Sequence, residues 1–407
     1  MPLSARDFAA DTPLHHFFLW NERCRRPDRR YLLAREPGRL PGDIAARLRA
    51  AVGSPDIGAH AAVFAAFEAA DRGSAPRHVL VIRLGALGDF IQSLGPFAAI
   101  RRHHRQDHVT LLTTRPFAAF AAELGYFDEI IVDARPGTLA PAGWLALRRR
   151  LRQHPFARVY DLQTSQRSSA YAWLLRPGTP QWSGIARGAS HPHANLDRDR
   201  QHTLDRQAEQ LLMAGIYPTP LPVLPPLDRT LPAELAGRGF LLLAPGSSPH
   251  RPEKRWPAGR FAAVAQALAD GGLLPVIVGS TAEAPLGAAI RALCPAALDL
   301  VGRTDLGLLA TLAGRARLTI GNDTGVSHLA AAAGCPLVVL FSRHSEPERC
   351  APRGGAAVCI LGEPDLNDLP AARVISEALS LLSSSSWPGL TRPSTTEPPG
   401  CPDQVRA

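Results

Sequence analysis

Two segments in the second half of the chain combine residue types that can bind phosphate. The first, GNDTGVSHLAAAAG (Gly321–Gly334), follows an apolar run and continues into the small residues of a helix. At such a helix start we expect free backbone amides at Asp323, Thr324 and Gly325, which together with the helix dipole favour an anion such as a diphosphate. In the alternative interpretation, Asp323 or Thr324 only caps the helix.

The second segment, LLLAPGSSPHRPEKRWP (Leu241–Pro257), places a loop rich in Gly, Ser and Pro after another apolar run. Ser247 and Ser248 can donate hydroxyl hydrogens to phosphate oxygens. Lys254 is the only lysine in a chain with 45 Lys and Arg residues. Its compact ammonium group could stabilise charge on a departing phosphate, an effect that is often the largest in catalysis. The alternative is a solvated surface lysine.

A third segment, IRLGALGDFIQSLGP (Ile82–Pro96), has the pattern of a strand, a glycine loop and a helix start. Gly85 and Gly88 do not form the G-x-G-x-x-G fingerprint of dinucleotide binding, and an acid at the helix start repels phosphate. Asp89 instead suits a general base, a role worth about 10²–10⁴ in rate. Its alternative role is to complement the helix dipole.

Strands must position these loops, and from Arg77 onward short apolar runs alternate with amphipathic stretches. The predicted strands are His78–Arg83, His108–Thr114, Glu129–Ala134, Arg158–Gln163, Phe240–Gly246, Leu274–Ser280, Leu298–Gly302, Arg317–Asp323 and Pro336–Ser342. Helical segments between them predict parallel sheets. A proline-rich stretch, Tyr217–Pro232, predicts a linker. The result is two doubly wound α/β halves, a fold class that binds ligands at the carboxyl ends of its strands.

The two ends of the chain differ from this pattern. Residues 1–76 include an alanine-rich helical pattern, and we predict a helical extension packed on the main body, with a partly disordered leader as the alternative. Residues 383–407 are rich in Pro and Ser and are predicted to be a disordered tail. The two predicted domains are therefore residues 77–230 and 231–382.

The composition is that of a globular protein, with 45% hydrophobic and 20% charged residues. The net charge of +9 predicts anionic partners, which could be nucleic acid, a phosphorylated glycolipid or a nucleotide. Nucleic acid is disfavoured because the 6% of aromatic residues are scattered and form no basic-aromatic cluster. Six widely spaced cysteines without a C-x-x-C pair fit a reducing cytoplasm, and no signal peptide or membrane span is expected.

Three basic segments in the first half could contact an anionic acceptor or membrane leaflet. They are the runs Arg101–Arg105 and Arg148–Arg152, and the Arg- and His-rich segment Gly184–His202. For the two runs we favour solvated helix ends, where positive charge complements the helix dipole. For Gly184–His202 the alternative is a solvated loop.

Four motifs taken together resemble glycosyltransferase family 9, the heptosyltransferases, over about His78–Leu382. The motifs are RLGALGD (Arg83–Asp89), PGSSPHRPEKRWP (Pro245–Pro257), GSTAE (Gly279–Glu283) and GNDTGVSHLAAAAG. The resemblance implies an α/β, GT-B fold with two Rossmann-like doubly wound parallel-sheet domains facing across a crevice, the first binding the acceptor and the second a nucleotide sugar. It also implies an inverting, metal-independent enzyme without a cofactor.

The resemblance assigns a role to each candidate residue. Asp89 would be the catalytic base and Lys254 the lysine that contacts the phosphate. Hydroxyls on the phosphate would come from Ser247 and Ser248, and contacts with the diphosphate and sugar from Asp323, Thr324 and Gly325. Glu283 would bind ribose, and His328 lies on the first turn of the following helix. The implied partners are ADP-heptose, an anionic glycolipid acceptor of the lipopolysaccharide core and, peripherally, the inner membrane leaflet, but not nucleic acid.

Two other functions remain open from the residues. One is a different GT-B enzyme, such as a nucleotide-sugar epimerase or hydrolase, in which Asp89 would remove a sugar proton or activate water. The other is a nucleotide-sugar-binding protein without catalytic activity.

Overall fold

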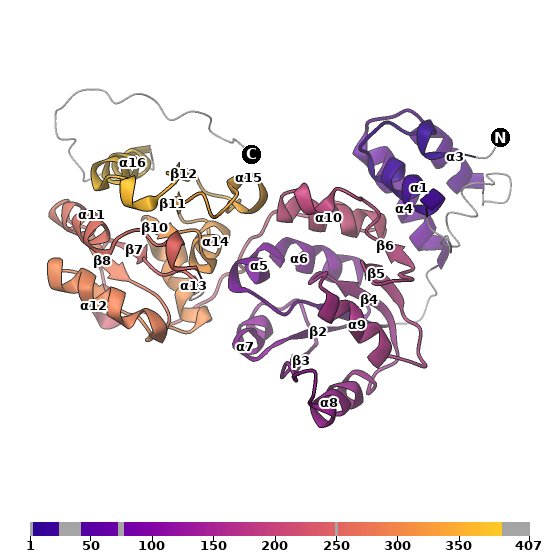
Figure 1. Ribbon diagram of the computed structural model, residues 1–407, viewed down its shortest axis with the longest axis horizontal. Helices are drawn as coiled ribbons and strands as arrows, with labels where there is room; N and C mark the ends of the chain where they lie inside the picture. Colours follow the sequence, from indigo (N-terminus) through magenta and orange to yellow (C-terminus); the bar gives the residue numbers. More distant parts are fainter. Residues whose placement is uncertain (1–2, 24–41, 72–76, 249–250, 385–407) are drawn as a thin grey trace. The chain divides into compact units, whose positions relative to one another are not determined.

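The computed structural model describes residues 3–23, 42–71, 77–248 and 251–384 (Figure 1). They form two compact units, residues 1–222 and 223–407, whose boundary falls inside the proline-rich stretch. Of the segment predicted as a disordered tail, residues 385–407 lie outside the described part of the chain.

The first unit contains a parallel sheet with strand order β3-β2-β1-β4-β5-β6. Its strands are β1 (His78–Ile82), β2 (His108–Thr114), β3 (Glu129–Asp133), β4 (Phe156–Asp161), β5 (Gln181–Gly184) and β6 (His191–Pro192). The apolar runs of β1 and β2 are buried on both faces, as expected for central parallel strands. The short strands β5 and β6 were not predicted, because neither contains an apolar run.

Helices connect these strands and cover the sheet (Figure 1). They are α5 (Leu87–Gln92), α6 (Leu94–His103), α7 (Arg115–Glu123), α8 (Pro141–Leu151), α9 (Gln166–Leu174) and α10 (Thr203–Met213). Helix α10 packs on α5 and α6, and α8 packs on α9. Helix α5 follows β1 directly, so the packing of α10 also fixes the helix that bears Asp89.

The described part of residues 1–76 is helical and packs on the first unit. It contains α1 (Pro13–Arg23), α3 (Gly42–Ala51) and α4 (Ile57–Asp71). The ring of Phe17 lies 5.7 Å from that of Phe18 and 5.6 Å from that of Phe64, both in edge-on pairs. The same apolar cluster includes Leu212 and Met213 at the end of α10. Burial of such aromatic rings is a large apolar contribution. Residues 24–41 and 72–76 lie outside the described part.

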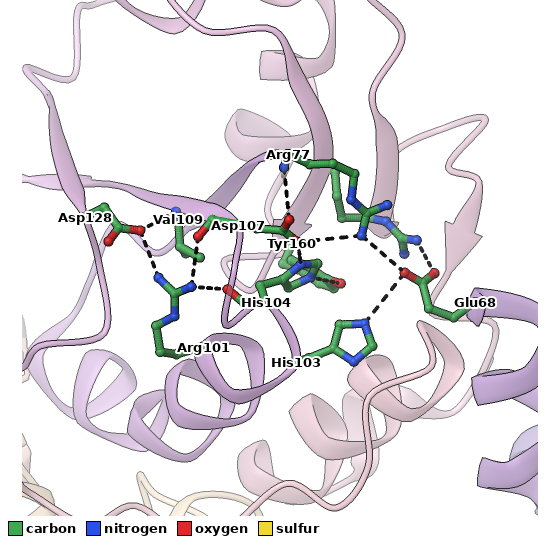
Figure 2. Close-up of polar contacts among 10 residues, drawn as sticks. Glu68, Arg77, Arg101, His103, His104, Asp107, Val109, Asp128 and Tyr160 are labelled. Atoms are coloured by element: carbon green, nitrogen blue, oxygen red, sulfur yellow. Dashed lines mark hydrogen bonds and ion pairs between the residues drawn. The ribbon is translucent and has the colours of Figure 1, made fainter. Parts of the chain in front are cut away.

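A buried ion pair joins this extension to the sheet. Arg158 on β4 is fully buried and donates to the carboxylate of Glu68 on α4, which is 2% exposed. Arg77 and His103 also approach Glu68, at 3.8 and 3.6 Å (Figure 2). Burial by itself would raise the pKa of Glu68, but the hydrogen bond with His103 and the charge of Arg158 lower it to about 2. Glu68 therefore stays ionised and neutralises the buried guanidinium.

The run Arg101–Arg105 is only partly a solvated helix end, so that prediction is wrong for its buried member, His104. His104 is fully buried between Asp107 Oδ2 at 2.5 Å and the Tyr160 hydroxyl at 2.8 Å (Figure 2). Burial lowers the pKa of His104 to about 3. Arg101 donates to Asp128 Oδ2 at 2.8 Å. In Arg148–Arg152 the arginines at 149, 150 and 152 are exposed, as predicted.

The second unit repeats the topology, with strand order β12-β11-β10-β7-β8-β9. Its strands are β7 (Phe240–Ala244), β8 (Leu274–Ile277), β9 (Leu298–Asp299), β10 (Thr319–Asn322), β11 (Leu337–Phe341) and β12 (Val358–Gly362). Numbered along the chain, both sheets have the order 3-2-1-4-5-6, the doubly wound order of Rossmann-like folds. The order reverses between β1 and β4 in the first unit and between β7 and β10 in the second. Strand β12 was not predicted.

Helices pack on both faces of the second sheet. They are α11 (Ala258–Asp270), α12 (Ala284–Leu293), α13 (Leu306–Arg315), α14 (Gly325–Ala332), α15 (Pro347–Cys350) and α16 (Ala371–Ser384). The last helix, α16, packs on α11 and buries Val374, Ala378 and Leu382 in the core of this unit. The end of the described chain is therefore part of the second unit.

The Glu68–Arg158 pair leads to a stability prediction. We expect Glu68→Gln to lower the free energy of unfolding by about 3–5 kcal/mol, because Arg158 would keep a buried charge without a carboxylate partner. Denaturant unfolding followed by circular dichroism measures this. Glu234→Gln removes an exposed carboxylate and should cost no more than about 0.5 kcal/mol. Glu68→Leu combined with Arg158→Met should recover most of the loss, and unchanged stability in Glu68→Gln would contradict the argument.

His104 leads to a second prediction, on pH dependence. The folded protein keeps His104 neutral down to a pKa of about 3, whereas the ordinary pKa is 6.5, so the unfolded chain binds an extra proton between these values. Stability should therefore fall as pH falls through this window, by up to about 1.4 kcal/mol per pH unit from this group. His104→Gln should reduce the slope measured by urea unfolding over that window. Equal slopes in the two proteins would argue against this assignment.

Candidate functional site

The two predicted phosphate loops meet at one edge of the second sheet. Strands β7 and β10 are parallel neighbours, with Ala244 opposite Gly321, so the loops that follow them begin side by side. Asn322 joins these loops: its Nδ2 donates to the carbonyls of Pro245 and Gly246 at 2.8 and 3.1 Å, and its Oδ1 accepts from the Trp256 amide at 3.1 Å. Sequence reasoning missed this fully buried residue, although it stands at the strand end next to Asp323.

Lys254 and Asp323 form an ion pair at this edge. Lys254 Nζ lies 2.9 Å from Asp323 Oδ2, and the side chains are 18% and 9% exposed. Ser345 Oγ donates to the same oxygen at 2.7 Å, and His328 Nε2 lies 3.9 Å from Asp323 Oδ1. Lys254 is therefore not a solvated surface lysine. The carboxylate holds the ammonium group in place beside the start of α14.

The start of α14 differs in one respect from the predicted anion site. The Asp323 amide donates to the Leu340 carbonyl at 3.1 Å, so the prediction that it is free is wrong: the neighbouring strand β11 uses this donor. Thr324 is the N-cap residue, and its side chain makes no capping hydrogen bond. Within the described residues its Oγ1 is buried without a partner. The donors left for an anion are therefore those of Thr324 and of the first helical residue, Gly325.

The serines of the loop have different environments. Ser247 is buried, donates to the Arg251 carbonyl at 2.8 Å and accepts from Arg255 Nε at 3.0 Å. Its hydroxyl hydrogen therefore holds the loop in shape. Ser248 is exposed, and residues 249–250 after it lie outside the described part of the chain.

Glu283 lies at the same edge, in the loop after β8. Its Oε2 accepts from the Ser280 amide at 2.5 Å and from the Ser280 hydroxyl at 3.0 Å, which closes the short helix Thr281–Glu283. Glycines make room for this carboxylate: a Cβ atom at Gly279 would lie 2.7 Å from Oε2, and one at Gly246 would overlap Oε1. Glu283 is thus packed against the loop that follows β7.

In the first unit, Asp89 lies on α5 at the carboxyl end of β1. Its side chain is 44% exposed, Oδ2 accepts from the Ala86 amide at 3.3 Å, and Oδ1 lies 3.3 Å from Arg83 Nη2. Asp89 therefore also has its alternative role of complementing the helix dipole, because its carboxylate accepts a hydrogen bond at the start of α5. It also remains accessible to an incoming group.

Arg83 fixes the backbone beneath Asp89. This buried guanidinium donates from Nε and Nη2 to the Asp89 carbonyl at 3.1 and 2.8 Å, and from Nη1 to the Leu162 carbonyl at 2.5 Å. Burial lowers the pKa of Arg83 from its ordinary value. Because Leu162 follows β4, Arg83 joins the loops at the point where the strand order reverses. In the sequence, Arg83 could have been recognised as a functional residue because it is a single arginine directly after an apolar strand.

A cavity of about 410 Å³ opens beside this loop. It is lined by Leu84, Gly85, Ala86, Thr114, Phe117, Arg135, Gln163, Ser165 and Arg167, which come from the carboxyl ends of β1 to β4. Arg167 stacks over Trp144, 4.8 Å from the ring centroid, and donates to the Tyr171 hydroxyl at 2.8 Å. Sequence reasoning missed both arginines, each of which lies just after a predicted strand. The cavity has the size of a ligand site and carries positive charge.

The segment Gly184–His202 is not a solvated loop over most of its length. It contains β6, and its residues 191–195 and 202 are buried. His193 Nε2 lies 3.0 Å from Glu209 Oε2, and Arg198 Nε donates to His193 Nδ1 at 3.1 Å. The polar residues are paired inside the fold, which explains how a segment without an apolar run can be buried.

Within the described ranges, no three His, Cys, Asp or Glu side chains are grouped so that they could hold a metal ion. Among the helices that the structure describes, none has the length and apolar character needed to span a membrane.

Two Rossmann-like units, each with ligand-type loops at the carboxyl edge of its sheet, define the GT-B fold class. Residues 144–373 match the sequence profile of glycosyltransferase family 9 (heptosyltransferase), and the chain belongs to this family.

Three known proteins illustrate the similarity. The lipopolysaccharide core heptosyltransferase OpsX of Haemophilus influenzae is 24% identical over 297 residues, covering 68% of this chain and 82% of its own. Lipooligosaccharide heptosyltransferase 2 of the same organism is 32% identical over 133 residues, 31% of this chain and 38% of that protein. The solved ADP-heptose lipopolysaccharide heptosyltransferase II of E. coli shares the fold with a TM-score of 0.64 at 21% identity, over 76% of this chain and 100% of that one.

Asn322 is the residue whose loss should loosen the site. We expect Asn322→Ala to lower the free energy of unfolding by about 2–4 kcal/mol, because it leaves buried backbone groups without partners. Hydrogen exchange at the Trp256 amide should become faster. The control is Asn367→Ala, since Asn367 is exposed and its side chain bonds only to Asp365 among the described residues. Equal protection of Trp256 in both variants would contradict the role of Asn322.

Proposed function

We propose that this glycosyltransferase moves a heptose from ADP-heptose to an anionic lipopolysaccharide-core acceptor, with inversion at the anomeric carbon and without a metal ion. The main support is the Lys254–Asp323 pair, which places an ammonium group beside Thr324 at the start of α14. The related proteins, a lipopolysaccharide core heptosyltransferase and an ADP-heptose lipopolysaccharide heptosyltransferase, agree with this proposal.

The donor would bind at the edge where β7, β8 and β10 end. Its diphosphate would accept from the amides of Thr324 and Gly325 and from the Thr324 hydroxyl, which is otherwise unpaired. Lys254 would stabilise the charge that develops as the diphosphate departs. Glu283, packed against Gly246, would accept from ribose hydroxyls.

The other donor-site residues would act less directly. Asp323 orients Lys254 rather than offering its amide, and His328 lies beside Asp323. Ser248 is exposed and could donate to phosphate, whereas Ser247 would do so only by releasing the Arg251 carbonyl.

The acceptor would bind in the first unit. The cavity between β1 and β4 has two guanidinium groups, Arg135 and Arg167, that suit an anionic group on the acceptor. Ala86 lines this cavity and donates its amide to Asp89, so Asp89 stands at the cavity's rim. This position suits a base that takes a proton from an acceptor hydroxyl.

The reaction follows from these roles. Asp89 accepts the proton of the acceptor hydroxyl, whose oxygen bonds to the anomeric carbon of the heptose as the bond from that carbon to the diphosphate breaks. The oxygen enters opposite the leaving group, which inverts the anomeric configuration. ADP leaves with the electron pair, and the positive charge of Lys254 stabilises it. We further propose a cytoplasmic site of action with peripheral contact to the inner membrane leaflet, because the proposed acceptor is a membrane glycolipid.

A single assay tests this function. The purified protein is incubated with ADP-heptose and a lipid A–core acceptor in the presence of EDTA, and mass spectrometry detects heptosylated product. NMR then gives the anomeric configuration. Breakdown or isomerisation of the donor without acceptor would instead indicate a hydrolase or epimerase. Donor binding with no product on any acceptor, unchanged in Asp89→Asn, would indicate a binding protein.

Lys254 gives the sharpest kinetic prediction. We expect Lys254→Ala to lower kcat by about 10²–10³-fold, as for the loss of one charge-stabilising donor. Lys254→Arg should restore activity only in part, because a planar fork does not replace a compact ammonium group beside Asp323. Thermal unfolding of each variant separates loss of catalysis from loss of fold. Activity of Lys254→Ala within a few fold of the parent would remove Lys254 from the mechanism.

A further inference from the structure

Helices α8 and α9 lie side by side on the first unit (Figure 1). They carry an exposed tryptophan among arginines. Trp173 at the end of α9 is 63% exposed, and the Arg176 guanidinium carbon lies 3.9 Å from the centroid of its ring. Arg148 on α8 donates to the backbone carbonyls of Trp173 and Arg176 at 3.4 and 2.8 Å. These contacts fix the tryptophan at the surface instead of burying it.

The exposed side of α8 continues this surface. Leu145, Arg149 and Arg152 follow one another at spacings of four and three residues, which puts them on one side of the helix, and all three are exposed. Together with Trp173 and Arg176 they form what we call the α8–α9 face. Apolar and cationic side chains alternate on it.

The charge around the α8–α9 face has one sign. Residues 134–196 contain nine arginines and a single acid, Asp161, which is fully buried. Two carboxylates of β3 lie near these helices. Asp133 is buried and lies 3.5 Å from Arg167 Nε on α9, and Glu129 pairs with Arg150 at 3.7 Å and with His154 at 2.7 Å. Among the described residues, none of the three exposed arginines of the face has a carboxylate within ion-pair distance. Their charge is available to an anionic partner.

We propose that the α8–α9 face docks on an anionic lipid bilayer. This inference rests on the proposed function, whose acceptor is lipid-linked, and it names the surface by which the enzyme would meet that lipid. Tryptophan rings concentrate at the boundary between headgroups and acyl chains, and basic side chains are attracted to anionic headgroups. A guanidinium stacked on the ring can enter that boundary with it. One tryptophan does not provide the series of stacking rings that single-stranded nucleic acid requires.

Vesicle co-sedimentation tests the docking surface on the full chain. Wild-type protein should bind phosphatidylcholine vesicles that contain phosphatidylglycerol, should not bind phosphatidylcholine alone, and should be released by high salt. The triple variant Arg149→Gln/Arg152→Gln/Arg176→Gln should bind about tenfold more weakly or worse. Trp173→Ala keeps the net charge and should also weaken binding several fold.

The matched control removes three charges elsewhere. Arg238→Gln/Arg291→Gln/Arg303→Gln changes exposed arginines of the second unit and should bind as wild type. Equal loss in both triple variants would overturn the proposal in favour of non-specific charge attraction. The proposal would also be overturned if the wild type failed to bind anionic vesicles. Displacement of the wild type from these vesicles by an oligonucleotide, at a lower concentration than that of the lipid, would overturn it as well.

A water-soluble, deacylated acceptor separates this inference from the proposed function. Transfer to that acceptor should be the same in the parent, the face variants and the control, while transfer to vesicle-embedded acceptor should fall with the face variants alone. If the wild-type protein transfers sugar to neither acceptor, the proposed function is refuted, but the result of the vesicle-binding experiment still stands. Equal loss on both acceptors would refute a docking role for the face.

Discussion

The first unit depends on how the charge of Arg158 is neutralised. A guanidinium in the middle of a parallel sheet has no access to water, and an unpaired charge there is strongly destabilising. Its carboxylate partner, Glu68, comes from a helix that lies before the first strand. The N-terminal helices are therefore a structural part of this unit. They pack on α10, which packs on the helices that follow β1, so the extension supports the loop that carries Asp89.

The second unit uses a partly buried charge pair for a different purpose. Lys254 and Asp323 stand at the open edge of the sheet, where their side chains keep some exposure, so the pair can respond to a ligand. An ammonium group already held by a carboxylate loses less freedom on binding than a flexible one, which is the advantage of a preorganised site. Asn322 and Arg83 have parallel tasks: each joins the two loops at the point where the strand order of its unit reverses. The same topology thus provides the same anchoring position in both units.

Several properties of the protein follow from the sequence alone. Central strands such as β1 and β7 are buried on both faces, so they must be apolar throughout, and local composition reveals them. The loops Pro245–Pro257 and Gly321–Gly334 are likewise recognisable, because glycine, serine and an acid at a helix start are local signals. Parallel connectivity then predicts that both loops begin at one edge of a sheet, and at this edge the structure pairs Lys254 with Asp323.

Other properties were decided only by the tertiary structure. The Asp323 amide is bonded because β11 lies next to β10, and the charge of Arg158 is neutralised by a residue 90 positions away. Strands β5 and β6 are short and largely polar and gain their pairing from neighbours already in place, whereas β12 was not predicted although it is apolar. Arg135 and Arg167 share a cavity only because β3 and β4 end at the same edge. In each case the deciding partner is distant in sequence, and the physical reason is the same: burial and hydrogen bonding depend on what lies nearby in space, which local residue patterns do not specify.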